Sequence, residues 1–143
     1  MHILILGAAG MVGRKLTERL LRDGRLGKSD ITSMTLQDVV APSKPDSKIP
    51  VKVVASDFAD AGAAAPLVAE RPDVIFHLAA IVSGEAEAEF DKGYRINLDG
   101  TRYLIDAIRA VGGGYKPRLV FTSSIAVFGA PFPEKIGDEF FHT

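Results

Sequence analysis

The N-terminal segment constrains the fold of this chain more strongly than any other part. Residues 2–6 are apolar and stop at Gly7, which predicts a short β-strand that is buried on both faces. An amphipathic helix is predicted over residues 11–23. Between strand and helix, glycine recurs at every third position, as Gly7, Gly10 and Gly13. A glycine-rich turn in this setting is typical of a site that binds phosphate groups at a helix N-terminus.

The same alternation of strand and helix continues along the rest of the chain. Further strands are predicted at residues 31–38, 51–54, 73–78 and 118–122, and further helices at 61–70 and 85–111, whereas 129–143 show no clear period. Five strands that alternate with helices predict one α/β domain, a Rossmann-type doubly wound parallel sheet with helices on both faces. Ligands bind such sheets at the carboxyl ends of the strands, so functional residues are expected directly after each strand.

The composition excludes several classes of function. The chain has no cysteine, which rules out disulfides, thiolate nucleophiles and cysteine-bound metals. Its 17 Lys and Arg nearly balance 18 Asp and Glu, so nothing points to nucleic acid or to an anionic membrane as a partner. The three histidines are too scattered to suggest a metal site, and no apolar run reaches the roughly 18 residues of a membrane helix. We therefore expect a cytoplasmic protein without a metal.

Each glycine of the turn has a distinct predicted role in holding a dinucleotide. Gly7 allows the tight turn, Gly10 lets a pyrophosphate approach the backbone, and Gly13 lets the helix pack closely on the strand. The helix N-terminus, which includes Met11 and Val12, offers free N–H groups to the phosphates. The alternative is a purely structural turn without a ligand.

The cofactor preference is predicted from Asp38, which ends the second strand about 25 residues after Gly13. A carboxylate at this place accepts hydrogen bonds from the ribose hydroxyls of the adenosine half. It also repels a 2′-phosphate, so NAD is favoured over NADP. The alternatives are a solvated loop aspartate at Asp38 and a 2′-phosphate ligand at Arg14, which is otherwise an exposed helix residue.

Five motifs in chain order resemble those of the extended short-chain dehydrogenase/reductase family, which comprises NAD-dependent epimerases and dehydratases. They are Gly7-x-x-Gly10-x-x-Gly13, Ser56-Asp57-Phe58, His77-Leu78-Ala79-Ala80, residues 94–101 and residues 121–129. The cofactor-binding residues that this resemblance implies, besides the turn and Asp38, are Asp57, Phe58, Leu78, Ala79, Ala80, Asn97 and Thr122. In the family the aspartate after the third strand bonds the adenine amino group, and the segment after the fourth strand lies along the cofactor.

Several of these residues also have a structural interpretation. Asp57 could only cap the following helix, and Asn97 could tie down a neighbouring loop as well as support the active-site backbone. His77 is expected to be a satisfied core residue rather than a base. Ser83 could reach a hydroxy-acid substrate or could cap the next helix.

The catalytic residue that the resemblance implies is Ser124, whose hydroxyl would bond the reacting oxygen of the substrate, with Ser123 in a supporting role. The general acid/base of the family is a Tyr with a Lys four residues later. None of the three tyrosines of this sequence has a Lys at that spacing. The sequence is therefore interpreted as the N-terminal part of a longer enzyme, residues 1–143 being its NAD-binding domain and inactive alone.

The substrate class rests on resemblance alone. Residues 80–88, 90–94 and 124–133 are similar to family members that oxidise the 2-hydroxyl of a four-carbon sugar acid with NAD. A nucleotide-sugar epimerase or dehydratase is the alternative enzyme, and a non-catalytic NAD-sensing domain is the alternative from another class. In the family the helix that matches 85–111 pairs across a two-fold axis, which implies that the complete protein is a homodimer.

Overall fold

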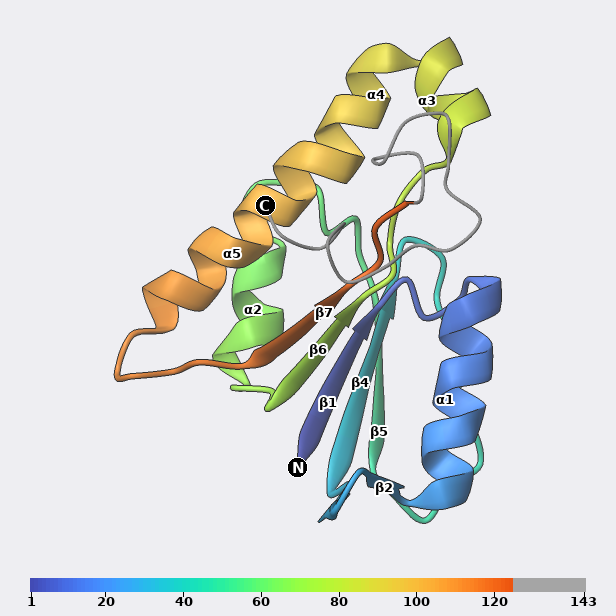
Figure 1. Cartoon of the computed structure of the whole chain (residues 1–143), viewed down its shortest axis with the longest axis vertical. Coiled ribbons are helices and arrows are strands. Elements are labelled where there is room, and N and C mark those ends of the chain that lie inside the picture. The colour runs from blue at the N-terminus through green and yellow to red at the C-terminus, as the bar shows by residue number, and fades with distance from the viewer. Residues whose placement is uncertain (125–143) are drawn as a thin grey trace, which may run out of the picture.

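The computed structural model describes residues 1–124, apart from the side chain of Ser83 (Figure 1). Its centre is a parallel sheet of β1 (His2–Leu6), β4 (Ser33–Asp38), β5 (Val51–Ala55), β6 (Val74–His77) and β7 (Arg118–Phe121). The strands lie in the order β5-β4-β1-β6-β7. The chain therefore winds outward from β1 to β5, then crosses back to β6 on the other side of β1. This topology confirms the predicted doubly wound sheet.

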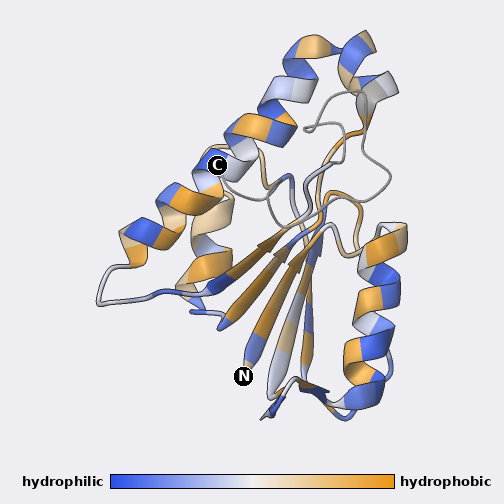
Figure 2. Ribbon diagram, viewed as in Figure 1, coloured by the Kyte–Doolittle hydropathy of each residue, from blue (hydrophilic) through white to orange (hydrophobic). Residues whose placement is uncertain are grey.

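Helices cover both faces of the sheet. Helix α1 (Met11–Asp23) packs on one face, and α2 (Ala64–Ala69) and α5 (Gly100–Val111) pack on the other (Figure 1). Alternate residues of β1 point to opposite faces, so Ile3 and Ile5 join the α1 side and Leu4 and Leu6 join the other. Figure 2 shows hydrophobic residues along the central strands and alternating character along the helices. Each buried Leu or Ile contributes roughly 1.5–3 kcal/mol, which fixes the helices to the sheet.

The long helix predicted over residues 85–111 is confirmed from Phe90 onward and is wrong before that residue. Four helical segments occupy this range, and the last three follow one another without a gap. They are α3 (Ser83–Ala88), α4 (Phe90–Tyr94), the π-helical turn η1 (Arg95–Asp99) and α5. Glu89 breaks the first helix with φ −125° and ψ 71°. The π-helical turn then changes the residue spacing before α5 begins. Phe90, Tyr94 and Leu98, which recur every four residues, lie on one surface and form an exposed row at 65, 55 and 56% exposure.

Smaller differences from the sequence-based prediction lie at element ends. The second strand begins at Ser33 rather than near residue 31, and the predicted helix 61–70 is reduced to α2. A two-residue ribbon, β2 (Arg25–Leu26) with β3 (Ser29–Asp30), follows the left-handed Gly24 that ends α1 and was not predicted. Such short pairs have no periodicity to detect. The predicted irregular segment 129–143 lies outside the described residues.

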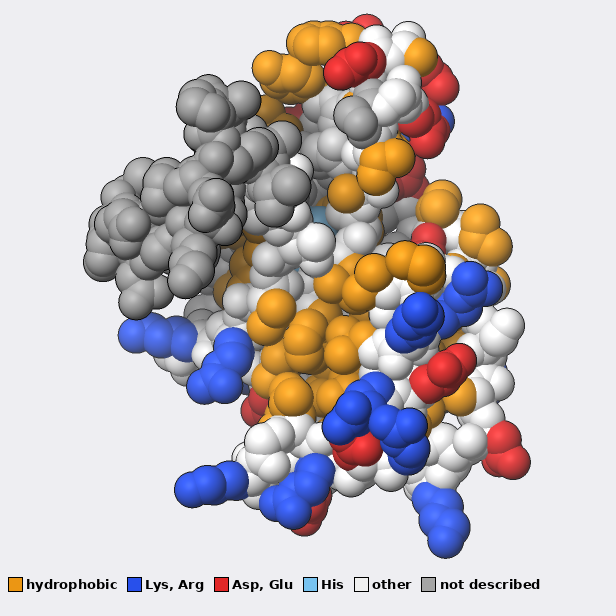
Figure 3. All heavy atoms as spheres, turned by 45° about the vertical axis from the view of Figure 1, so that its right-hand side comes forward, with side chains coloured by type: hydrophobic (Ala, Val, Ile, Leu, Met, Phe, Trp, Pro, Cys, Tyr) orange, Lys and Arg blue, Asp and Glu red, His pale blue; other side chains and the backbone are white. Residues whose placement is uncertain are grey.

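The β7 edge of the sheet is much less covered than its centre. Leu119, Val120 and Phe121 are all exposed, and among the described strands β7 pairs only with β6. Figure 3 shows hydrophobic side chains gathered on this side of the molecule, with Lys and Arg side chains below them.

Within residues 1–124, none of the helices combines the length and the apolar character needed to cross a membrane.

The turn between β1 and α1 is compact because two of its glycines leave no room for a side chain. Gly7 has φ +85°, in the left-handed region that favours glycine. A Cβ on Gly13 would lie 2.2 Å from the carbonyl oxygen of Gly7 and 2.7 Å from the Cα of Ala8. These atoms belong to the backbone and cannot move aside. The predicted role of Gly13, close packing of helix on strand, is confirmed.

Gly13→Ala is expected to lower the free energy of unfolding by about 1–3 kcal/mol or more, because the new methyl group overlaps backbone atoms. Urea unfolding followed by circular dichroism measures this change. Gly84→Ala is the matched control, since a Cβ there meets no atom within 4 Å. Its effect should stay within about 1 kcal/mol. Equal effects of the two substitutions would contradict the packing explanation.

Candidate functional site

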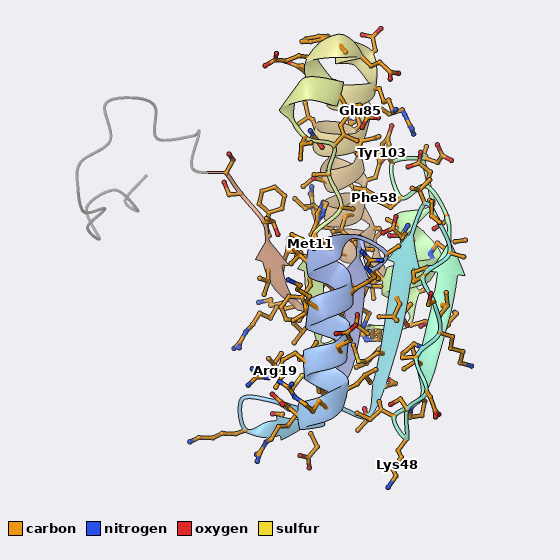
Figure 4. The ribbon with its side chains drawn as sticks, turned by 90° about the vertical axis from the view of Figure 1, so that its right-hand side faces the viewer. Met11, Arg19, Lys48, Phe58, Glu85 and Tyr103 are labelled. Carbon is orange, nitrogen blue, oxygen red and sulfur yellow. The ribbon has the colours of Figure 1, made fainter. Side chains whose placement is uncertain are left out.

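A cavity of about 690 Å³ opens at the carboxyl ends of β1, β4, β5 and β6. Figure 4 shows Met11, Phe58 and Glu85 toward this end of the molecule, and Arg19 and Lys48 toward the other. The described residues that line the cavity are Gly7, Ala9, Gly10, Gln37, Asp38, Val39, Val40, Ser56, Asp57, Phe58, Leu78, Ala79, Ala80, Ile81, Glu85, Lys92, Arg95 and Ile96. The site lies where ligands bind in doubly wound sheets.

The glycine-rich turn is bonded directly to the end of β4. The amides of Gly7 and Ala8 donate to the carbonyl oxygen of Gln37 at 2.9 and 3.0 Å. The amide of Ala9 donates to Oδ2 of Asp38 at 2.8 Å, and the amide of Val39 donates to Oδ1 at 2.7 Å. Asp38 is therefore held in place by backbone donors and is not a freely solvated loop residue. Each carboxylate oxygen retains a lone pair for a further hydrogen bond, such as one from a ribose hydroxyl.

The start of α1 is suited to an anion. Gly10 is the N-cap residue, no side chain caps the helix, and its first turn contains no acidic residue. A Cβ on Gly10 would meet only the carbonyl oxygen of Gly7, at 3.3 Å, and the φ of Gly10 is an ordinary −67°. Neither backbone strain nor tight packing accounts fully for glycine here, whereas close approach of a ligand does. The residues of this wall thus fit the phosphates of a dinucleotide.

Asp57 forms the part of the cavity that follows β5. Its Oδ2 accepts a hydrogen bond from Nη2 of Arg95 at 2.6 Å, and its Oδ1 accepts one from the amide of Ala59 at 3.0 Å. Burial alone would raise the pKa of Asp57, but these hydrogen bonds outweigh it and hold the pKa below its usual value. Asp57 does not cap the next helix, because α2 has Ala63 at its N-cap. The alternative that assigned it that role is wrong.

Phe58 and His77 belong to the buried layer beneath the cavity. The ring of Phe58 is 4% exposed and meets the His77 ring edge-on, with centroids 5.1 Å apart. His77 Nε2 lies 2.9 Å from the hydroxyl of Thr101, which donates to the carbonyl oxygen of Asn97, so Nε2 carries the proton. Burial lowers the pKa of His77 to about 4, so its ring is neutral at pH 7. The expectation of a core histidine rather than a base agrees with this geometry.

Asn97 holds the loop after β6 in place with both ends of its side-chain amide. Its Oδ1 accepts from the amide of Ile81, and its Nδ2 donates to the carbonyl oxygen of Ile81, both at 3.0 Å. The π-helical turn carries Asn97 to this position. Asn97 therefore supports the cavity wall at Ala80 and Ile81 from behind, as the loop-tying interpretation predicted, and is not itself among the lining residues.

The polar residues after β7 lie outside the described cavity wall. The amide of Thr122 donates to the carbonyl oxygen of His77 at 3.2 Å, and Ser123 and Ser124 follow as exposed residues. Ser83 begins α3, and Val82 is the N-cap, so the predicted capping role for Ser83 is wrong. The catalytic and substrate-binding roles of these serines stay predictions.

The structure brings together eight of the predicted cofactor residues at one cavity. These are Gly7, Gly10, Asp38, Asp57, Phe58, Leu78, Ala79 and Ala80, whereas Met11, Val12, Gly13, Asn97 and Thr122 are not among the lining residues. Sequence reasoning missed the charged residues Glu85, Lys92 and Arg95. The helical spacing of Lys92 and Arg95, three residues apart and close before Asn97, was the signal that could have revealed them.

No tyrosine in the described residues is arranged as a general base. The hydroxyl of Tyr115 donates to the carbonyl oxygen of Pro72 at 2.8 Å, and burial raises its pKa to about 12. Tyr94 is exposed on α4, and Tyr103 lies under the guanidinium of Arg102.

Over residues 1–124, no group of three or more His, Cys, Asp or Glu side chains is placed to hold a metal ion.

Several known proteins are similar to this chain in sequence or structure. The chain is 41% identical to D-erythronate dehydrogenase from Cupriavidus necator over 97% of this chain and 43% of that protein. A solved nucleoside-diphosphate-sugar epimerase from Agrobacterium tumefaciens is 65% identical, with a TM-score of 0.89 over 95% of this chain and 41% of that one. A variant of uronate dehydrogenase from the same organism, in complex with NAD, is 33% identical, with a TM-score of 0.67 over 86% of this chain and 40% of that one.

The chain thus spans about two fifths of the length of the proteins it matches. A model of the NAD dependent epimerase/dehydratase family matches residues 3–143, which is nearly the whole sequence. The parallel sheet, the glycine-rich turn and the cavity at the carboxyl ends of the strands agree with that match. The chain belongs to the NAD dependent epimerase/dehydratase family.

Proposed function

We propose that this chain is the NAD-binding part of a cytoplasmic oxidoreductase that acts on a four-carbon sugar acid such as D-erythronate. The observation that carries the NAD site is the cavity in which the glycine-rich turn, Asp38 and Asp57 meet. The amides at the start of α1 would hold the pyrophosphate, and Asp38 would accept from the adenosine ribose. Asp57 would accept from the adenine amino group, and the backbone of Leu78–Ala80 would lie along the cofactor.

When bound, NAD supplies the acceptor for the hydrogen and electron pair that leave the alcohol carbon. The chain contributes Ser124, whose hydroxyl is proposed to bond the reacting oxygen and orient it, with Ser123 and Ser83 beside the substrate. The hydroxyl proton must also leave, so the reaction requires a general base whose pKa lies near the working pH. We propose that a Tyr-x-x-x-Lys pair beyond Thr143 provides that base in the whole enzyme, since none occurs in this sequence.

The sugar-acid substrate is supported by the 41% identity to D-erythronate dehydrogenase. The second candidate is a nucleotide-sugar epimerase, because the solved epimerase from Agrobacterium tumefaciens is 65% identical to this chain. Assays of the whole enzyme with four-carbon sugar acids, and with UDP- and dTDP-sugars, separate the two. Activity on neither class, with NAD still bound, would favour a dinucleotide-sensing role.

Asp38→Asn is expected to reduce the preference of the chain for NAD over NADP from at least about tenfold to about threefold or less. The amide oxygen can still accept from Ala9, but the negative charge that repels a 2′-phosphate is gone. Calorimetric titration of both dinucleotides measures the ratio of dissociation constants. The ratio is the informative quantity, because a disturbed turn would weaken both ligands alike.

Asp46→Asn, in the exposed loop between β4 and β5, is the control and should leave that ratio unchanged. If the unmodified chain binds NADP as tightly as NAD, the role assigned to Asp38 is incorrect.

The 143-residue chain alone is expected to bind NAD without forming NADH from D-erythronate, whereas a longer form that carries the Tyr-x-x-x-Lys pair turns over. General acid–base help is worth about 10²–10⁴-fold. In the longer form, Ser124→Ala should lower kcat by about a hundredfold, as for loss of one oriented donor. NADH absorbance at 340 nm records both rates.

Ser43→Ala, in the exposed loop after β4, should retain full turnover. Comparable turnover by the 143-residue chain would mean that the base has been misassigned. Full activity of Ser124→Ala would remove that serine from the mechanism.

We also propose that the complete protein is a homodimer that buries the exposed row Phe90, Tyr94 and Leu98. Leu98→Glu places a charge in this row and is expected to shift the complete protein to a monomer at micromolar concentration. Light scattering measures the mass. Lys15→Glu, on the exposed side of α1, is the control and should stay dimeric. A monomeric parent protein would refute the assignment.

A further inference from the structure

Arg95 connects the helical segment to the loop after β5 at the wall of the cavity. Its Nη2 donates to Oδ2 of Asp57 at 2.6 Å, and its Nη1 donates to Oδ1 of Asp60 at 3.1 Å. The planar guanidinium thus spans two carboxylates of the same loop, which the single ammonium of a lysine cannot do in this geometry. Arg95 and Asp57 both line the cavity, so the ion pair faces the ligand.

The loop that carries Asp57 is also anchored from β4. The amide of Ser56 donates to the carbonyl oxygen of Asp38 at 3.0 Å. The side chain of Gln37, which is 1% exposed, donates from Nε2 to the carbonyl oxygen of Ser56 at 2.5 Å. Asp57 therefore stands between a fixed backbone on one side and the Arg95 guanidinium on the other.

The Asp57 carboxylate presents only acceptor atoms to the cavity. An ionised carboxylate has about four acceptor positions, and the described contacts of Asp57 use two of them. The other cation of the wall, Lys92, is occupied elsewhere, because its Nζ bonds Oε1 of Glu85 at 2.5 Å. The donors of Arg95 point at Asp57 and Asp60, so a purine edge that reaches this loop meets an acceptor.

We propose that Arg95 determines the base specificity of the dinucleotide site, by fixing Asp57 as an acceptor that selects a 6-aminopurine over a 6-oxopurine. The inference rests on the proposed NAD site and extends it to a residue outside the predicted set. A 6-amino group donates to Asp57, whereas a 6-oxo group places a second acceptor against it. Without Arg95 the carboxylate can rotate or take up a proton, and the two bases become similar.

The test compares NAD with nicotinamide hypoxanthine dinucleotide, which has a 6-oxo group in place of the amino group. Calorimetry on the 143-residue chain gives both dissociation constants. The parent chain should bind NAD at least about tenfold more tightly than the 6-oxo analogue. Arg95→Gln should weaken NAD by about tenfold and the analogue by less than threefold, so that the selectivity largely disappears.

Two further variants separate an effect on base selectivity from a general effect on the structure. Arg95→Lys keeps the charge near Asp57 without spanning both carboxylates, and should recover part of the selectivity. Arg102→Gln removes a guanidinium of α5 that pairs with Asp99, and should leave both dissociation constants unchanged. Circular dichroism confirms that each variant is folded.

Equal weakening of both dinucleotides in Arg95→Gln would show a purely structural role and overturn the inference. So would an unchanged preference for NAD. In either case the NAD site itself stands, provided that Asp38→Asn still alters the NADP ratio. Failure of the parent chain to bind either dinucleotide would overturn the proposed function and this inference together.

Discussion

Three hydrogen bonds between the turn after β1 and the end of β4 determine where the rest of the site lies. Consecutive amides of Gly7, Ala8 and Ala9 all donate to β4, two to the carbonyl oxygen of Gln37 and one to the carboxylate of Asp38. They fix the turn on the sheet and thereby the direction in which α1 leaves it. The helix can follow that direction only because Gly13 has no side chain. A carboxylate positioned by backbone donors in this way is preorganised for a ligand.

A second chain of hydrogen bonds ties the helical side of the cavity to β6. His77, at the end of β6, bonds Thr101 of α5, whose hydroxyl donates to the backbone of Asn97. The amide of Asn97 then holds Ile81, just after β6. The buried, neutral histidine is thus part of the support of the site. Its unusual pKa reflects desolvation and has no need of a catalytic explanation.

The sequence predicted the parts of the fold that depend on local patterns. An apolar run that stops at glycine placed β1, and apolar residues four apart, Val12, Leu16 and Leu20, placed α1 almost to the residue. The π-helical turn was missed because Phe90, Tyr94 and Leu98 keep helical spacing into it. The break at Glu89 was missed because it lies before Phe90, where that apolar pattern begins. Periodicity records which residues are apolar and does not distinguish a face packed on the core from one left exposed.

Only some residues of the candidate site were predictable, namely those whose residue type the local backbone or the end of a strand requires. The glycines and Asp38 follow from backbone geometry and from their place after a strand. The partners of Asp57 could not be predicted, since Arg95 lies 38 residues away in sequence and meets it only through the packing of α5 on α2. Ion pairs of this kind depend on tertiary structure, which a single sequence does not reveal.

The two hydrogen bonds between Asn97 and Ile81 depend on one atom, the side-chain nitrogen Nδ2 of Asn97, which makes this side chain an amide and not a carboxylate. The side chain presents an oxygen to an N–H and a nitrogen to a carbonyl, both at 3.0 Å, as a neighbouring strand would. Hydrolytic deamidation would exchange that nitrogen for oxygen at nearly constant shape. Two oxygens would then face each other with a negative charge added, and the loop after β6 would lose its anchor. The position of the loop after β6 therefore depends on residue 97 remaining an amide.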